Sequence, residues 1–262
     1  MRLDRYLLEN GFTASRESAK RLIEEGLVTV NGAVVTKPAK EITGTPLISV
    51  VEKKYVGRGG EKLEAALSLF EIDVKNLCAL DIGASTGGFT DCLLQHGAAH
   101  VVALDAGTGQ LHPRLLADSR VTNIEKYNAR MLCKHDVGEV DIVVMDVSFI
   151  SQAYILPQIP SVLAEGGIAV TLIKPQFEAG RAALNKQGIV RAPRDRIRAI
   201  TRVLDAAVLA GLSPVGLAPS PILGGDGNEE YLAYFVRSIS TSTLSPVAVE
   251  NTVKNKAVIR LL

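Results

Sequence analysis

The chain has 262 residues, of which 47% are hydrophobic and 22% are charged, and its formal net charge at pH 7 is +1. This length allows one large domain or two smaller ones, and the apolar content excludes wholesale disorder. No run of about 18 uninterrupted apolar residues occurs, so we expect no membrane span, and the charged N-terminal sequence is unlike a signal peptide. The three cysteines form no C-x-x-C pattern and the four histidines show no metal-ligand spacing. We therefore expect a cytoplasmic protein without a metal.

The charge is unevenly distributed. Residues 1–60 hold ten Lys and Arg against seven Asp and Glu, and residues 175–202 hold seven against two. Two basic segments on a nearly neutral chain favour positioned contacts to a polyanion over a generally basic protein. The alternative for either segment is a solvated charged face.

The first sixty residues predict a small module of two helices and a hairpin. Leucines at helical spacing begin the chain, and a second helix is predicted over 12–26. The β-branched runs that follow are joined by Asn31 and Gly32, the strongest two-residue hairpin signal. The basic side chains that this module presents are Arg2, Arg5, Arg16, Lys20 and Arg21.

The pattern R-x-x-A-x-x-L-I-x-x-G-x-V-x-V-N-G runs from Arg16 to Gly32, within a matching stretch over 2–42. It resembles the S4 RNA-binding domain. The resemblance implies that the basic helix face and the hairpin hold structured RNA through phosphates and shape. A generic helix-hairpin module is the alternative. We expect this domain over 1–52 and a basic linker over 53–60.

From about residue 77, strands and helices alternate, which predicts an α/β fold with a Rossmann-like sheet. Strands are predicted at 77–82, 100–107, 121–126, 141–149, 168–174 and 230–237, and helices at 87–97, at 150–167 with interruptions at Pro157 and Pro160, and at 191–212; the segment 213–219 follows the last helix. The segment 241–262 has no predicted structure. Ligands of such sheets lie beyond the carboxyl ends of the strands. Asp81, Asp105, Asp146 and Lys174 follow apolar runs at those ends.

The loop Gly83-Ala84-Ser85-Thr86-Gly87 fits the G-x-S-x-G elbow of serine hydrolases. A hydrolase needs a histidine late in the sheet, but the last of the four histidines, His135, precedes the fifth predicted strand. A nucleotide loop explains more, because Asp105 comes about 20 residues later, where a carboxylate can bind ribose hydroxyls. The spacing is not G-x-G-x-x-G, and a cationic sulfonium suits an acidic rim better than a pyrophosphate does. S-adenosylmethionine is therefore the predicted cofactor, with a plain strand-helix turn as the alternative.

Methyl transfer to a ribose hydroxyl requires alignment of that hydroxyl and help in losing its proton. Lysine is a poor base at its reference pKa of about 10.4; burial or a second cation lowers that pKa, and a carboxylate orients the amine. Two lysines and one or two carboxylates are thus a reasonable set. Lys62, Asp146, Lys174 and Glu230 are the candidates. Taken singly, each has a bland alternative, such as a solvated charge or a helix cap, and Lys174 is the hardest to dismiss.

Residues 57–237 resemble an FtsJ-type ribose 2′-O-methyltransferase, and with the S4-like module the chain resembles the TlyA family, often labelled haemolysin A. The motifs are GRGGEKLEAAL, LDIGASTGGFTD, LDAGTGQL, MDVSFIS, LIKPQFEAG, GIVR and GNEEY. The resemblance implies a methyltransferase domain over 61–240 that modifies ribosomal RNA. It also implies a Lys-Asp-Lys-Glu tetrad at Lys62, Asp146, Lys174 and Glu230, with Lys174 as the base or as the group that orients the hydroxyl.

The expected cofactor contacts are Asp81, Gly83, Ala84, Ser85, Thr86, Gly87, Gly88, Phe89, Asp105, Asn128 and Asp146. Besides the five basic residues of the first module, the expected RNA contacts are Lys53, Lys54, Arg58, Arg181 and Arg191. Other functions stay open: base methylation at an exocyclic amine, for which an [ND]-P-P-[YF] motif is absent, a non-catalytic RNA-binding or ribosome assembly factor, and a membrane-active haemolysin. The expected partners are ribosomal RNA and ribosomal subunits, with no membrane.

Overall fold

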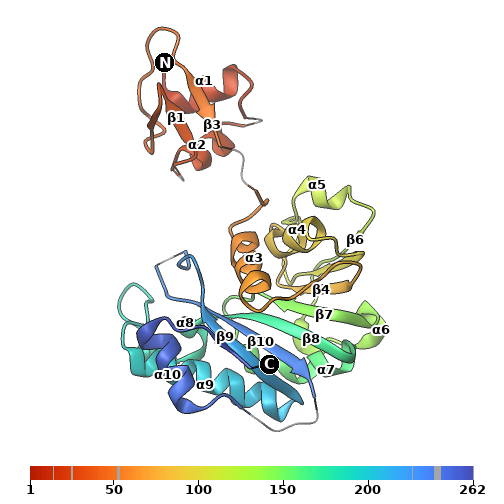
Figure 1. Cartoon of the computed structure of the whole chain (residues 1–262). Helices are drawn as coiled ribbons and strands as arrows, with labels where there is room; N and C mark the ends of the chain where they lie inside the picture. Colours follow the sequence, from red (N-terminus) through yellow and green to blue (C-terminus); the bar gives the residue numbers. More distant parts are fainter. Residues whose placement is uncertain (14, 25, 52–53, 226, 239–242, 262) are drawn as a thin grey trace. The chain divides into compact units, whose positions relative to one another are not determined.

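The computed structural model describes every residue except 14, 25, 52–53, 226, 239–242 and 262. The chain forms two compact units, residues 1–54 and 55–262 (Figure 1). Within the described residues, no helix combines the length and the apolar character that crossing a membrane requires.

The first unit packs two helices against a small antiparallel sheet. It contains α1 (Leu3–Glu9), α2 (Arg16–Glu24), β1 (Val28–Val30), β2 (Ala33–Val34) and β3 (Ile48–Val50), in the sheet order β2-β1-β3. The predicted hairpin is confirmed, since Asn31 and Gly32 have φ of 52° and 79° and join β1 to β2. Leu3, Leu7 and Ile23 are fully buried in the core of this unit.

The second unit is built on one mixed sheet of eight strands. Its strands are β4 (Cys78–Ile82), β5 (His100–Leu104), β6 (Val121–Ile124), β7 (Val140–Met145), β8 (Leu163–Ile173), β9 (Leu212–Pro219), β10 (Tyr231–Arg237) and β11 (Ile259–Arg260), in the order β11-β9-β10-β8-β7-β4-β5-β6. Strands β4 to β8 are parallel to their neighbours among themselves, while β10 lies antiparallel between β8 and β9. The predicted α/β fold is confirmed.

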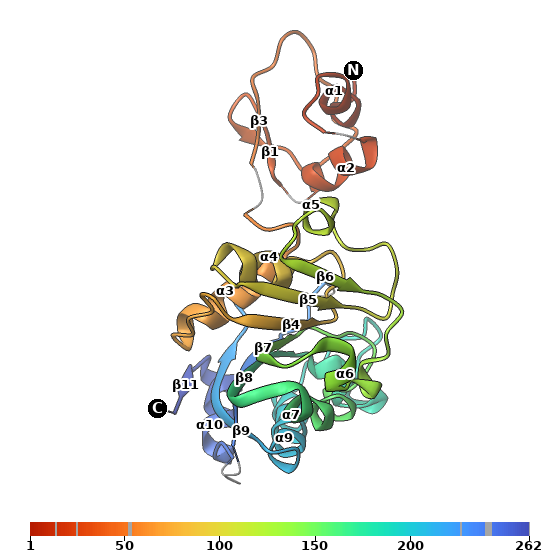
Figure 2. The ribbon, with the colours of Figure 1, turned by 90° about the vertical axis from the view of Figure 1, so that its right-hand side faces the viewer.

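Helices cover both faces of this sheet (Figures 1 and 2). One core packs α3 (Gly59–Leu69) and α4 (Gly88–Gln95) against the sheet. The other packs α7 (Ile159–Val162), α9 (Pro193–Leu209) and α10 (Pro246–Asn255). The sequence alternates accordingly, since Leu80 and Ile82 enter the second core and Ala79 the first.

The helix predicted over 150–167 is wrong for most of its length. The structure has two short 3-10 turns, η2 (Gln152–Tyr154) and η3 (Leu156–Gln158), then the single turn of α7, and β8 begins at Leu163. Pro157 and Pro160 cannot donate main-chain hydrogen bonds, which shortens each turn. Leu163 pairs with Val140 of β7, and after an irregularity in the register the pairing resumes at Ile168 with Ile142.

The last segment, 241–262, for which no structure was predicted, contains the helix α10 and the short strand β11. Ser245 caps α10 by accepting a hydrogen bond from the amide of Ala248 at 3.2 Å, and Val249 and Val253 are buried in the sheet's second core. β11 then pairs with β9. Residues 55–60, expected in a linker, belong to the second unit, where Tyr55 is 2% exposed.

Candidate active site

The glycine loop between β4 and α4 is shaped by two left-handed glycines. Gly83 has φ of 84°, and a Cβ atom there would lie 2.7 Å from the main-chain oxygen of Asp146. Gly87 has φ of 94°, and its Cβ would lie 2.2 Å from a methyl carbon of Leu115. Only glycine fits both positions without displacing the chain. The tight turn brings the start of α4 close to the carboxyl ends of β4 and β7.

Two adjoining cavities lie along this loop. The first, of about 330 Å³, is lined by Gly57, Arg58, Gly59, Lys62, Gly83, Ala84, Ser85, Thr86, Gly88, Phe89, Asp146, Ser148, Lys174, Gly225 and Glu230. The second, of about 740 Å³, includes Asp105, Gln110, Tyr127, Asn128, Phe149 and Ile150 in its lining. Gly83, Ser85, Asp146 and Ser148 line both. The two cavities therefore meet at the ends of β4 and β7.

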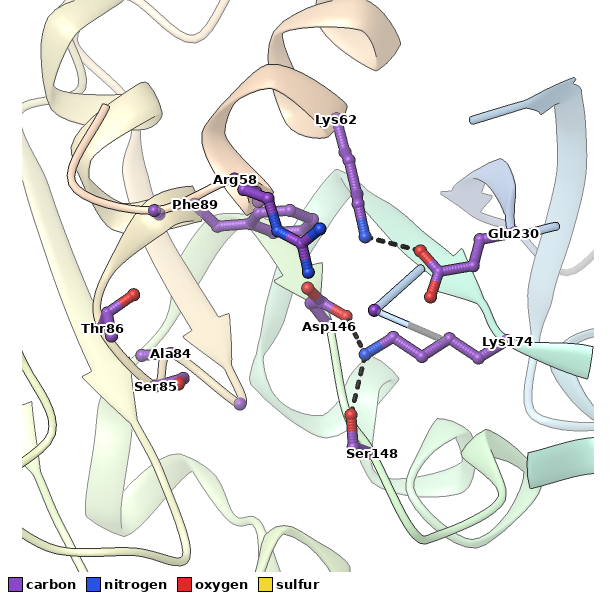
Figure 3. Close-up of a pocket in the computed structure, with 15 residues that line it drawn as sticks. Arg58, Lys62, Ala84, Ser85, Thr86, Phe89, Asp146, Ser148, Lys174 and Glu230 are labelled. Carbon is purple, nitrogen blue, oxygen red and sulfur yellow. Dashed lines mark hydrogen bonds and ion pairs between the residues drawn. The ribbon is translucent and has the colours of Figure 1, made fainter. Parts of the chain in front are cut away.

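All four residues of the predicted tetrad line the first cavity (Figure 3). Lys62 Nζ donates to Glu230 Oε2 at 2.5 Å, and both residues are buried. Lys174 Nζ lies 2.7 Å from Asp146 Oδ1 and donates to Ser148 Oγ at 2.8 Å. Four distant segments of the chain thus supply two interacting lysine–carboxylate pairs to one cavity.

Paired glycines at the start of α3 bring Lys62 into the cavity. A Cβ on Gly60 would lie 2.2 Å from the ring of Tyr55, and one on Gly59 would lie 3.2 Å from the ring of Phe89. The first turn of α3 is therefore packed between two aromatic side chains. Around Glu230, a Cβ on Gly224 would lie 2.5 Å from Glu230 Oε1, so the main chain at Gly224 packs tightly against the carboxylate.

Asp105 fixes the glycine loop to the next strand. Its Oδ2 accepts from the amide of Ser85 at 2.8 Å and its Oδ1 from the amide of Gly107 at 2.7 Å. Ser85 Oγ donates to Gln110 Oε1 at 3.2 Å. No histidine is found among the described residues that line either cavity, so Ser85 lacks the base that a nucleophile needs.

Two of the expected cofactor contacts line neither cavity. Gly87 contributes to the shape of the loop through its left-handed backbone conformation. Asp81 is fully buried on the α4 side of the sheet, where its Oδ2 accepts from the amide and the hydroxyl of Thr90 at 2.9 and 2.7 Å. Burial raises the pKa of Asp81 to about 7, and the carboxylates of Asp146 and Asp105 add to the increase.

The expected RNA contacts occupy several settings. Arg2 and Arg16 both bind the buried carboxylate of Asp4, and Arg5 pairs with Glu9. Lys20, Arg21, Lys54, Arg181 and Arg191 are exposed. Arg58 lines the first cavity, where its guanidinium is turned toward Asp146 (Figure 3). Lys53 lies outside the described residues.

Ser148, Phe149 and Gln110 are cavity residues that the sequence analysis missed. Ser148 and Phe149 come two and three residues after Asp146, so their place just beyond a strand end was the available signal. Phe149 has φ of 66° and is 92% exposed, which is unusual for a bulky apolar residue. Within the described part of the chain, no group of three or more His, Cys, Asp and Glu side chains could hold a metal ion.

The sequence of both units matches known families. Residues 55–237 match the model of the FtsJ-like methyltransferase family, and residues 1–45 match the S4 domain. The second unit is therefore a methyltransferase, and the first is an S4 domain.

Relatives that span nearly the whole chain narrow the family. Hemolysin A of Brachyspira hyodysenteriae is 47% identical over 90% of this chain and 100% of its own length. The 16S/23S rRNA (cytidine-2′-O)-methyltransferase TlyA of Mycobacterium tuberculosis is 41% identical over 96% of this chain and 95% of its own. A Streptococcus thermophilus structure that bears a hemolysin name superposes with a TM-score of 0.79 at 40% identity, covering 98% of this chain and 95% of that one. The chain belongs to the TlyA (hemolysin A) family of FtsJ-like methyltransferases.

The family implies S-adenosylmethionine, and the second cavity fits it. Its volume lies in the range of small-molecule sites, and it joins apolar side chains such as Ile150 to the carboxylates of Asp105 and Asp146. A Cβ at Gly83 would crowd the boundary between the cavities. Carboxylates suit both a ribose and a cationic sulfur.

Proposed function

We propose that the protein methylates ribose 2′-hydroxyls of ribosomal RNA, in the cytoplasm, with S-adenosylmethionine as methyl donor. The observation that carries this proposal is the meeting of the two cavities at Asp146 and Ser148, with both lysine–carboxylate pairs on one side of it. The names of the TlyA relatives and the S4 domain support ribosomal RNA as the acceptor.

Asp105, Asn128, Ser85 and the backbone of the glycine loop would hold the cofactor in the second cavity. When bound, S-adenosylmethionine supplies an electrophilic methyl group on a cationic sulfur. The Asp146 carboxylate stabilises positive charge at the boundary of the two cavities.

Lys174 would hold the acceptor hydroxyl in line and, in its neutral form, take the hydroxyl proton as the carbon–oxygen bond forms; the methyl–sulfur bond would break and leave S-adenosylhomocysteine. Asp146 and Ser148 orient its Nζ through the contacts at 2.7 and 2.8 Å. Lys62 and Glu230 form the opposite wall, where their buried charges balance each other while Lys62 Nζ stays close to the cavity.

The S4 unit and the exposed arginines hold the RNA. Lys20 and Arg21 lie exposed on α2 beside Arg16, a surface that suits phosphates. In the second unit, Asn228 accepts from the amide of Val190 at 3.1 Å and donates to Gly188 O at 3.1 Å. This contact holds the basic loop that ends at Arg191 close to Glu230.

The test is methylation of ribosomal RNA from a strain that lacks the gene, followed by mass-spectrometric mapping of the modified atom. We expect a methylated ribose with the wild-type protein, none with Lys174→Ala, and full activity with Lys75→Ala, an exposed lysine that lines neither cavity. Full activity of a folded Lys174→Ala variant would refute the assigned roles, and a methylated base would refute ribose transfer.

Two further outcomes identify the other functions considered. A protein that binds RNA but shows no S-adenosylmethionine binding in calorimetry would be a non-catalytic RNA-binding factor. Leakage of dye from liposomes on addition of the purified protein alone would favour a haemolysin.

A further inference from the structure

Glu178 lies outside the two cavities but is connected to both. It ends α8 (Pro175–Glu178), which directly follows Lys174, and it is 2% exposed. Its Oε2 accepts from Ser151 Oγ at 2.5 Å and its Oε1 from the amide of Gln152 at 2.8 Å. Arg202 donates to its main-chain oxygen at 2.8 Å. The carboxylate is thus bound to the loop that starts at Asp146.

This loop, residues 146–152, is held at both ends by the segment 174–178. At its start, Asp146 and Ser148 contact Lys174. In its middle, the rings of Phe149 and Phe177 pack with centroids 5.2 Å apart. At its far end, the hydroxyl of Ser151 and the amide of Gln152 both donate to the Glu178 carboxylate.

The loop needs such an anchor. Phe149 holds a left-handed φ of 66° while 92% exposed, a geometry that persists only where neighbours enforce it. Burial raises the pKa of Glu178, because the ionised form loses its hydration. The two hydrogen bonds from the loop offset that cost, so carboxylate and loop order each other.

We propose that Glu178 is a positioning residue for methyl transfer, because it fixes the far end of the 146–152 loop. The hydrogen bond from Lys174 to Ser148 is thereby kept, and the Lys174–Asp146 pair keeps its orientation. The proposal rests on the proposed function, since it assigns Glu178 a part in that reaction.

Two substitutions separate positioning from packing. Glu178→Met keeps the side-chain volume but accepts no hydrogen bond; we expect the single-turnover methylation rate at saturating RNA and cofactor to fall about 10- to 100-fold. The cofactor dissociation constant, measured by calorimetry, should change far less than the rate. Glu178→Gln can accept from the Gln152 amide and donate to Ser151 Oγ, so it should restore most of the rate.

The control is Thr252→Ala, which removes a fully buried hydroxyl that donates to the main-chain oxygen of Ala248 within α10; Thr252 lines neither cavity, and the rate should be unchanged. Folding of each variant is checked by circular dichroism. If Glu178→Met does not fold, Ser151→Ala removes one of the two hydrogen bonds with little volume change, and its rate should fall. A wild-type rate in a folded Glu178→Met or Ser151→Ala variant, or equal losses in the Met and Gln variants, would overturn the proposal. An inactive wild-type protein would instead contradict the proposed function.

Discussion

Lys62 and Glu230 are 168 residues apart in the chain, yet Lys62 Nζ and Glu230 Oε2 lie 2.5 Å apart in the interior. The lysine comes from the first turn of α3 and the glutamate from the residue before β10. Their exposed fractions are 7% and 4%. Removal of either partner alone would leave a buried charge without its counter-ion.

We predict that Lys62→Met lowers the free energy of unfolding by about 3–5 kcal/mol, because the Glu230 carboxylate then stays buried and unpaired. The double variant Lys62→Met/Glu230→Met should recover most of that stability. Both variants should lack methyltransferase activity. Urea denaturation and the methylation assay measure the two effects; a double variant as unstable as the single one would show that the pair is not the source of the stability.

A substitution at Gly83 tests whether cofactor binding depends on the shape of the glycine loop between β4 and α4. Gly83→Val introduces a β-branched side chain at φ of 84° and a Cβ 2.7 Å from the Asp146 main-chain oxygen, so we predict loss of cofactor binding in calorimetry. Gly109→Ala is the control, because φ there is 64° but nothing lies within 4 Å of the added Cβ. Ser85→Ala should weaken cofactor binding only modestly, since only one hydrogen bond, to Gln110, is lost. Retention of wild-type affinity by Gly83→Val would contradict this interpretation of the loop.

The sequence could predict that the four tetrad candidates would share one cavity, because each lies at a recognisable position in the chain. Asp146 and Lys174 end apolar strands, and Lys62 and Glu230 lie in motifs of the family. The pairing within the tetrad could not be predicted. Lys174 pairs with Asp146 because their strands, β7 and β8, are neighbours, whereas Lys62 reaches Glu230 across the packing of α3 on the sheet.

The differences between the sequence-based expectations and the structure have physical causes. Asp81 follows the pattern of a strand-end ligand, but strand alternation turns its side chain toward α4, where Thr90 binds it. Residues 163–167 have the sequence pattern of a helix end, but β8 begins at Leu163, which pairs with Val140 of β7. The capping signal of α10, Ser245 before Pro246, was present in the sequence but overlooked.

The buried carboxylate of Asp4 allows a test of what stabilises the S4 unit. Its carboxylate is fully buried and accepts from Arg2 and Arg16 at 3.0 Å each, which lowers the pKa of Asp4 to about 2. We predict that Asp4→Asn destabilises residues 1–54 by about 1–3 kcal/mol at pH 7. Hydrogen exchange by mass spectrometry of the full chain measures this as faster exchange confined to that unit.

The matched control is Glu9→Gln, because the Arg5–Glu9 pair is exposed and contributes little. Since the folded pKa of Asp4 is depressed, its stabilising contribution is complete above about pH 4 and is lost as the pH falls toward 2. Equal exchange in the Asp4 and Glu9 variants would contradict a structural role for the buried carboxylate.

Asp81 should give the second unit an opposite pH dependence. Its pKa of about 7 in the folded protein exceeds the unfolded value of about 3.9, so the folded state binds the extra proton between those two pH values. The free energy of unfolding contributed by this group therefore falls as the pH rises from about 4 to about 7, and it stays low above that.

We predict that Asp81→Asn, which cannot ionise but keeps an oxygen that accepts from Thr90, removes this decline. Urea denaturation of the cofactor-free protein at several pH values between 4 and 8 measures it, with Asp141→Asn, at a partly exposed carboxylate that accepts from the Cys78 amide, as the control. Parallel pH curves for the wild-type and Asp81→Asn proteins would contradict a raised pKa of Asp81 in the folded protein.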